Sequence, residues 1–178
     1  MEVIGIIEVR PAGTFVTQLN VGNFMITIAP LFMLTSNTEQ DLLEFRRLLE
    51  TEAVRLAAEK QIQPAINRLH EAVALMRQSM LQDNPKIGVE ADVLFHKAIF
   101  QCSDNYVLMQ AAECVSYLLE NSVRMNRAQI LKNTAQAEIL LEQHQRILET
   151  IQQGDAVLAF AAMADHLQYV KKSLAKPD

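Results

Sequence analysis

From residue 36 onward, apolar residues recur every three to four positions, which is the period of an α-helix with one buried face. Ser36 followed by Glu39 has the spacing of a capping box and predicts the start of a first helix. Pro64 suits the first turn of a second helix, and Asp-Asn-Pro at 83–85 breaks it. The inner faces are predicted to carry Leu42, Phe45, Leu49, Ala53 and Leu56 in the first helix, and Ile66, Leu69, Val73, Met76 and Met80 in the second.

The same period continues through the middle of the chain. A third helix is expected over about residues 88–102. Asp104 can cap a long fourth helix that runs to about residue 131. We find no internal repeat and no low-complexity tract, so these helices belong to one bundle rather than to a repeat array.

Capping residues also divide the last part of the chain into two helices. Asn133, with Gln136 three residues later, predicts the start of a fifth helix that ends at Gly154. Asp155 then caps a sixth helix that runs to about Leu174. The joint between them is so short that these two helices are expected to be antiparallel neighbours. The sequence therefore predicts an all-α antiparallel bundle of about six helices.

The N-terminal residues follow a different pattern. Two short β-prone runs, at 6–9 and 14–16, are separated by the turn-forming residues at 10–13. They predict one small hairpin, which is too little structure to stand alone. The expected organisation is a hairpin segment at 1–18, a linker at 19–35 and an all-α domain at 36–178.

Composition narrows the class of protein further. Half of the 178 residues are apolar, and only five glycines and five prolines are present, which favours long helices over a turn-rich β fold. A net charge of −5 argues against broad, sequence-independent nucleic-acid binding by this chain alone.

The most apolar segment, 24–34, contains Pro30 and is about half as long as the ~20 residues that span a bilayer. The start of the chain lacks the basic region of a signal peptide, and Cys102 and Cys114 form no secreted disulfide framework. We therefore expect a cytoplasmic protein.

Four polar residues interrupt the predicted inner faces. Asp92 and His96 lie one turn apart on the third helix, so both side chains can reach a single ion. His144 and His166 occupy the apolar stripes of the fifth and sixth helices. A buried carboxylate and buried imidazoles are costly unless they are paired. Three nitrogens and one oxygen between helices are suitable ligands for a divalent metal.

Plainer interpretations of the same residues stay open. A lone buried histidine is usually a core residue with satisfied hydrogen bonds, and an Asp–His pair can be a simple hydrogen bond. His70, the fourth histidine, is at the flank of its stripe and is expected at the surface or its boundary. The sequence contains no HExxH motif, no phosphate-binding glycine-rich loop and no nucleophile elbow, so we predict no catalytic residue.

Three arginines are candidates for binding an acidic ligand beside such a metal. Arg46 is at the edge of the first helix's inner stripe and could pair with a carboxylate through two hydrogen bonds. From periodicity alone, a solvated position at the flank of the helix explains Arg46 slightly better than a role in binding a ligand. Arg124 and Arg127 are candidates of the same kind, and exposed charge is again the simpler interpretation.

These residues resemble a known family, the ligand-binding domain of FadR-type transcription regulators in the GntR superfamily. The resemblance covers about residues 36–173, and its order and spacing are similar to the lactate-responsive branch in particular. The matching segments are LLEFRRLLETEAVRLAA, ADVLFHKAI, EQHQRILETIQQGD and AAMADHL.

The resemblance implies an all-α bundle that forms a homodimer. It also implies a metal, often zinc, nickel or manganese, held by Asp92, His96, His144 and His166, with a small carboxylate effector beside it. Arg46 matches the arginine of the family's E-x-R segment, here Glu44-Phe45-Arg46.

The N-terminal segment IGIIEVRPAGTFV resembles the wing of a winged helix-turn-helix, with a shortened turn. The helices that would precede such a wing, including the recognition helix, are not in this chain. We therefore expect sequence-specific DNA binding only in a form with an intact winged helix-turn-helix.

Three functions compete at this point. The first is an effector-sensing and dimerisation domain of a bacterial transcription regulator, which binds a divalent metal and a small carboxylate. The second is a metal-dependent enzyme that acts on small carboxylic acids within a helical bundle. The third is a metal-free dimerisation module in which the inward polar groups form a hydrogen-bonded network.

Overall fold

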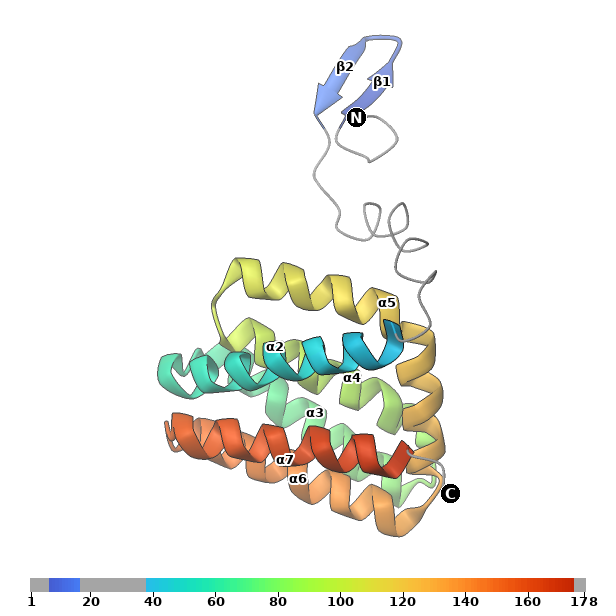
Figure 1. The fold of residues 1–178 in the computed structure, drawn as a ribbon, viewed down its shortest axis with the longest axis vertical. Helices are drawn as coiled ribbons and strands as arrows, with labels where there is room; N and C mark the ends of the chain where they lie inside the picture. Colours follow the sequence, from blue (N-terminus) through green and yellow to red (C-terminus); the bar gives the residue numbers. More distant parts are fainter. Residues whose placement is uncertain (1–6, 17–37, 175–178) are drawn as a thin grey trace.

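The computed structural model describes residues 7–16 and 38–174. It confirms an all-α bundle preceded by a small β-hairpin (Figure 1). The predicted linker at 19–35 and the predicted capping box at Ser36 lie outside the described residues. The elements are β1 (Ile7–Arg10), β2 (Gly13–Val16), α2 (Thr38–Lys60), α3 (Gln63–Leu81), α4 (Pro85–Cys102), α5 (Tyr106–Leu131), α6 (Thr134–Gln152) and α7 (Ala156–Leu174).

The hairpin is antiparallel and has a tight turn. Arg10 pairs with Gly13 at the turn, where Gly13 takes a φ of 133° that favours glycine. The Arg10 guanidinium lies 5.5 Å from the centre of the Phe15 ring and donates a 2.6 Å hydrogen bond to Glu8. The two predicted β-prone runs therefore do pair with each other.

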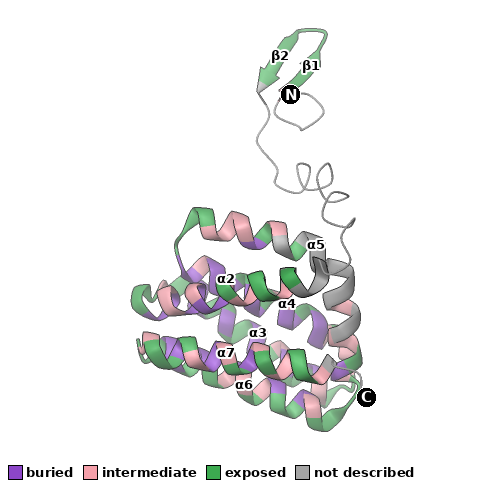
Figure 2. Ribbon diagram, in the orientation of Figure 1, coloured by how far each residue is buried: buried purple, intermediate pink, exposed green. Residues whose placement is uncertain are grey.

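The helices pack as neighbours that alternate in direction along the chain (Figure 1). α3 packs most extensively on α4, α2 packs on α7 and α4, and α6 packs on α7. Helices α6 and α7 are thus the antiparallel neighbours that their short joint predicted. Buried residues lie on the faces that the helices turn toward each other (Figure 2). Among the helices that the structure describes, none is both long enough and apolar enough to cross a membrane.

Two of the three predicted polar caps are confirmed, and one is wrong. The Asn133 side chain accepts a hydrogen bond from the backbone N–H of Gln136, and Asp155 accepts one from Leu158. The start of α5 is capped by Asn105 and not by Asp104. Asp104 instead has a φ of 44°, in the left-handed region, and forms the turn that follows α4. Either residue type can cap a helix, so the sequence could not distinguish between adjacent positions.

Helix α4 begins earlier than its apolar stripe indicated. The predicted start was near residue 88, but the helix begins at Pro85. Proline lacks a backbone N–H, which the first residues of a helix do not need, so it is well placed at the start. The segment that ends α3 is therefore also the segment that begins α4.

Gly154 permits close contact between the ends of α2 and α6. It follows α6 with a φ of 71°, and an added Cβ would lie 2.8 Å from Gln61 Nε2. Gln61 Nε2 donates to the backbone carbonyls of Ile151 and Gln152, both at 3.3 Å. These carbonyls belong to the last turn of α6, which has no partners for them within the helix. The predicted helix end at Gly154 is confirmed, and Gln61, the residue that follows α2, supplies part of its cap.

The inner face of α2 differs from the predicted one. Phe45 was expected to face the core, but 45% of its surface is exposed. The buried positions at this end of the inner face include Glu50, Ala53 and Ala57, which follow Arg46 at helical spacing. The buried face of α2 is therefore rotated by about one position from the predicted face. The apolar pattern did not detect this face, because it contains charged residues.

Candidate metal centre

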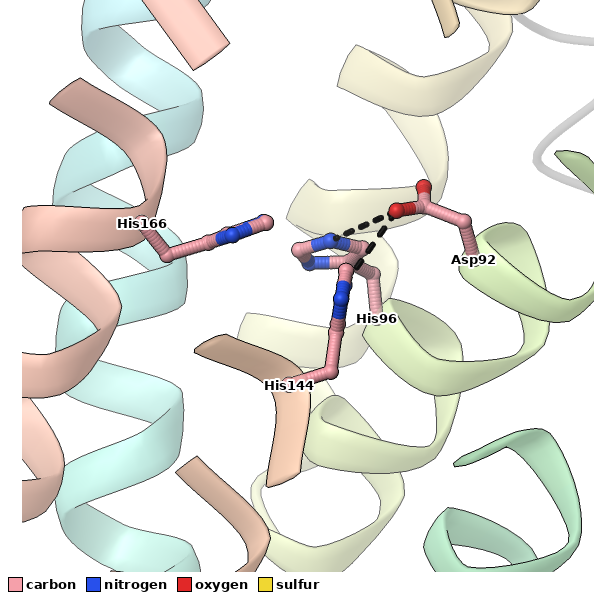
Figure 3. Close-up of side chains that lie close together, drawn as sticks. All are labelled: Asp92, His96, His144 and His166. Carbon is pink, nitrogen blue, oxygen red and sulfur yellow. Dashed lines mark ion pairs between the residues drawn. The ribbon is translucent and has the colours of Figure 1, made fainter. Parts of the chain in front are cut away.

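Asp92, His96, His144 and His166 converge in the interior of the bundle (Figure 3). Helix α4 supplies the first two residues, α6 supplies His144 and α7 supplies His166. One potential ligand atom from each residue lies within 4.8 Å of those of the other three. All four residues are buried, with at most 7% of their surface exposed. The structure thus brings together all four residues that the sequence nominated as metal ligands.

Each histidine of the cluster uses its Nδ1 atom to bind an oxygen. His96 Nδ1 donates to Glu50 Oε2 at 2.6 Å, and His144 Nδ1 donates to the Leu140 carbonyl at 2.6 Å. His166 Nδ1 donates to Gln143 Oε1 at 3.0 Å. Because these oxygens only accept hydrogen bonds, the proton of each neutral ring belongs on Nδ1. All three Nε2 atoms therefore carry a lone pair, which is the form that binds a metal.

Two of these Nε2 atoms, from His96 and His144, lie near the Asp92 carboxylate. Asp92 Oδ1 lies 3.2 Å from His144 Nε2 and 3.8 Å from His96 Nε2. His96 Nε2 and His144 Nε2 are buried without a hydrogen-bond partner, which costs about 1–3 kcal/mol per atom. Two donors bound tetrahedrally to one ion at about 2.0–2.1 Å are about 3.3 Å apart. The residues present therefore fit a divalent metal, and their role as metal ligands stays a prediction.

A buried layer of charged residues surrounds the cluster. Glu50, with 2% of its side chain exposed, binds His96 on one side and forms an ion pair with Arg46 on the other. Arg127, from α5, forms an ion pair with Asp92 Oδ2. The two side chains Arg46 and Arg127 are only 13% and 12% exposed. The cluster is thus enclosed by two buried arginine–carboxylate pairs.

This layer keeps both carboxylates ionised. Burial alone would raise the pKa of Asp92, but Arg127 and His96 outweigh that effect and hold the pKa well below its ordinary value. Burial likewise acts to raise the pKa of Glu50, and Arg46 and His96 reverse it to a net lowering. Burial lowers the pKa of Arg127 to about 10 although Asp92 opposes the change. At neutral pH the site therefore contains two anions and two cations before any ion binds.

The three candidate arginines have different surroundings. The exposed flank position considered for Arg46 is wrong, because its side chain is mostly buried against Glu50. Exposed charge is wrong for Arg127 as well, since Arg127 lies against Asp92. Arg124 forms an ion pair with Glu90, a residue with 61% of its side chain exposed. His70 is exposed, as predicted, and lies 3.0 Å from Gln152 through its Nε2 atom. That any of the arginines binds an effector stays a prediction.

Sequence reasoning missed Glu50 and Gln143, the two side chains that orient His96 and His166. A signal for Glu50 was present, because it lies one turn after Arg46 on the face that continues through Ala53 and Ala57. An acidic residue at an inner position of a helix indicates a polar site in the same way as the four residues of the cluster. Gln143 is half-buried beside His144, and its role depends on contact with another helix.

The metal-free protein is expected to lose stability as the pH falls from about 6.5 to 5. Burial lowers the pKa of His96, and burial together with His144 and His96 lowers the pKa of His166 well below its ordinary value. Below about pH 6.5 the unfolded chain therefore binds more protons at these two histidines than the folded chain does. Each of the two then reduces the free energy of unfolding by at most about 1.4 kcal/mol per pH unit. Urea unfolding in the presence of a chelator at pH 7.5 and 5.5 measures the change, and equal free energies would contradict it.

A cavity of about 360 Å³ reaches the cluster from the surface of the bundle. Its lining includes buried residues, among them Asp92 and His144, and we call this part its inner end. Its lining also includes exposed residues such as Asp83 and Glu138, where α3 ends and α6 begins, and we call this part its mouth. The cluster is therefore buried but can be reached by a small molecule through this cavity.

The fold defines this protein as an all-α bundle with a buried cluster of histidines between three helices. The chain belongs to the FCD domain family, which it matches over residues 41–169. This finding confirms the resemblance to GntR-superfamily regulators of the FadR type.

Similar proteins with curated names are transcription regulators. The HTH-type transcriptional regulator LutR of Bacillus subtilis is 27% identical over 176 residues, which cover 98% of this chain and 80% of that protein. The Glc operon transcriptional activator of Escherichia coli is 31% identical, covering 96% of this chain and 68% of that protein. The putative L-lactate dehydrogenase operon regulatory protein of Escherichia coli is 33% identical and covers 78% of this chain. This chain spans about half of that regulator's length, 52%.

Solved structures show the same fold. Streptococcus agalactiae GntR has a TM-score of 0.70 at 24% identity, covering 97% of this chain and 77% of that one. Escherichia coli McbR/YncC has a TM-score of 0.66 at 18% identity, covering 93% of this chain and 74% of that one. At this level of identity the likeness concerns the fold alone.

Proposed function

We propose that this protein is the effector-sensing and dimerisation part of a transcription regulator, and that it binds a small carboxylate through a divalent metal. Asp92, His96, His144 and His166 would hold the ion. The observation that carries the proposal is the convergence of the four side chains, since one potential ligand atom from each lies within 4.8 Å of those of the other three. Each imidazole also has an oxygen partner at Nδ1, which leaves its Nε2 atom for an ion. Zinc, nickel and manganese all suit a set of three nitrogens and one oxygen.

The charges around the cluster support an anionic effector. Among the described residues nearest the cluster, Arg46 and Arg127 offset Glu50 and Asp92, and burial favours the neutral forms of His96 and His166 by lowering their pKa values. A divalent ion would therefore leave two positive charges uncompensated in a buried place, which is costly. When bound, the ion supplies an open coordination position that a carboxylate oxygen can occupy. An acid that enters the site reduces this imbalance by one charge for each of its carboxylates.

Sensing requires that the effector favours one arrangement of the regulator over another. A ligand shifts such an equilibrium only by the difference between its affinities for the two arrangements. We propose that the arrangements are those of a homodimer, in the cytoplasm, and that DNA binding belongs to a form of the regulator with a winged helix-turn-helix. The hairpin β1–β2 has the antiparallel form that a wing requires.

The metal-loaded protein is expected to melt at a higher temperature when its acid is present. At a concentration 100 times the Kd, an effector stabilises the folded state by about 2.7 kcal/mol. For a chain of this size, that corresponds to a rise of about 5–11 °C in Tm. The measurement is a thermal melt with L-lactate, glycolate, malate, citrate and sugar acids, with and without prior removal of metal. L-lactate comes first because a similar protein is the putative L-lactate dehydrogenase operon regulatory protein of Escherichia coli.

Two results would contradict this proposal. One is a Tm that no acid in the series changes when the metal is bound. The other is an equal rise in Tm after the metal has been removed, because the acid would then bind elsewhere. Elemental analysis of the purified protein adds a direct check. A protein that takes up no zinc, nickel or manganese after loading is better explained as a metal-free dimerisation module.

A further inference from the structure

The cavity beside the cluster is lined mainly by apolar residues, whereas the cluster itself is polar. Its volume of about 360 Å³ falls within the range of roughly 300–1,000 Å³ that is usual for small-molecule sites. Apart from Asp92 and His144, most of its buried or half-buried lining residues are apolar. The apolar residues are Met76, Met80, Leu131, Ala137, Leu140 and Leu141, from α3, α5 and α6.

The polar lining residues of this cavity differ in burial. Asp92 and His144 are buried, and the His144 Nε2 atom has no hydrogen-bond partner. The Ser79 hydroxyl is also buried, but it already donates to the Asn84 carbonyl at 2.7 Å. The other polar lining residues are exposed or half-buried: Arg77, Asp83, Asn84, Thr134 and Glu138. A hydroxylated or charged chain along these walls would lose its hydration without gaining hydrogen bonds in return. A hydrocarbon chain would lose nothing of this kind and would gain from its burial.

We propose that the cavity binds the hydrocarbon tail of the effector, whose acidic head lies at the inner end beside Asp92 and His144. The ligand class is therefore a carboxylate with an aliphatic chain longer than that of lactate, and not a sugar acid or a compact dicarboxylate. This inference rests on the proposed function, because the head of the ligand needs the metal-loaded cluster. The methionines suit the role, since flexible thioether chains adapt to tails of different shape.

A series of straight-chain 2-hydroxy acids tests the proposal directly. All members share the same head and charge, so only the tail changes from L-lactate to 2-hydroxybutyrate and 2-hydroxyhexanoate. Each added methylene that leaves water should tighten binding by about three- to fourfold. From three to six carbons, the expected gain is therefore about thirty- to sixtyfold. Isothermal titration of the zinc-loaded protein measures the affinities.

The same series separates failure of this inference from failure of the proposed function. If lactate binds and the affinity stays flat or falls as the tail grows, the tail pocket is wrong and the sensor is unaffected. If no member of this series binds the zinc-loaded protein, the tail pocket is wrong, and the melts with malate, citrate and sugar acids then decide the proposed function. Neither conclusion needs a variant, so the test does not depend on whether a substitution disturbs folding.

A matched pair of substitutions in α6 locates the tail. Ala137 is buried and lines the cavity, whereas Ala135 on the same helix is exposed. Ala137→Leu fills part of the cavity and is expected to abolish the gain with chain length, while the affinities for zinc and lactate stay within about threefold. Ala135→Leu adds the same side chain at the surface and should keep the full gain. A length-dependent gain that survives in Ala137→Leu would overturn the assignment of the tail to this cavity.

Discussion

Replacing His144 with alanine is expected to weaken zinc binding by about two to three orders of magnitude. Structural zinc sites with four protein ligands bind with about 10–16 kcal/mol near neutral pH, or about 2.5–4 kcal/mol for each ligand. The loss of one ligand then corresponds to about a 100- to 1000-fold higher Kd. His144 is the most informative of the four candidate ligands to remove, because its Nε2 lies 3.2 Å from Asp92 Oδ1. Competition with a chromophoric chelator measures the Kd.

The fourth histidine of the chain provides a matched control. His70 is exposed on α3 and lies outside the cluster, so His70→Ala should leave the Kd for zinc within about twofold. His144 also packs edge-on against Phe95, with ring centres 4.7 Å apart. Helix content and the Tm without metal must therefore be measured for both variants. A folded His144→Ala protein with unchanged zinc affinity would show that this cluster does not hold the ion.

Much of the fold could be predicted because helices are specified locally. Asn133 and Asp155 each accept a hydrogen bond from a backbone N–H three residues later, so the sequence alone contains both partners. Failures occurred where two adjacent residues could play the same part. Asp104 and Asn105 are equally suitable caps, and only the path of the chain out of α4 decides between them. The sequence indicated Pro85 only as the end of a helix. A proline that ends one helix can also begin the next, and the apolar pattern does not distinguish these two roles.

The candidate cluster could be predicted for a related reason. Its four residues occupy apolar stripes, where a polar side chain is costly and therefore informative. Glu50 and Gln143 could not be assigned in this way, because their roles depend on contacts between helices. Glu50 binds a histidine 46 positions away, and Gln143 binds one 23 positions away. Such pairings follow from the arrangement of the bundle and not from any local pattern.

The contrast between α2 and the other helices has a physical cause. Helices α4, α6 and α7 each place one or two polar residues within an otherwise apolar face, so their periodicity is preserved. Helix α2 places Arg46 and Glu50 on its inner face in succession, which weakens the apolar signal at that end of the helix. The exposed Phe45 then shifted the predicted face by one position. Where the apolar period of a helix is interrupted by charged residues on its inner face, that part of the helix is thus expected to lie near a polar site.

Glu50→Gln is expected to weaken zinc binding by about 10- to 100-fold, the usual cost of losing a residue that orients a metal-binding histidine. Glutamine has the same shape and can still accept the hydrogen bond from His96 Nδ1, but it lacks the negative charge. That charge makes His96 a better electron donor and compensates Arg46, so its loss leaves an extra positive charge near the ion.

The effect of charge at Glu50 can be separated from general effects on α2. Glu59 lies on the same helix, is 48% exposed and pairs with Arg55, so Glu59→Gln makes the same chemical change at the surface. It should leave the Kd for zinc within about twofold, since surface ion pairs contribute little. If Glu50→Gln and Glu59→Gln bind zinc with equal affinity, His96 needs no anionic partner. If only Glu50→Gln loses affinity while its helix content is unchanged, the buried carboxylate of α2 acts on the ion through His96. The site then extends over four helices, because α2 contributes charge and orientation without contributing a ligand.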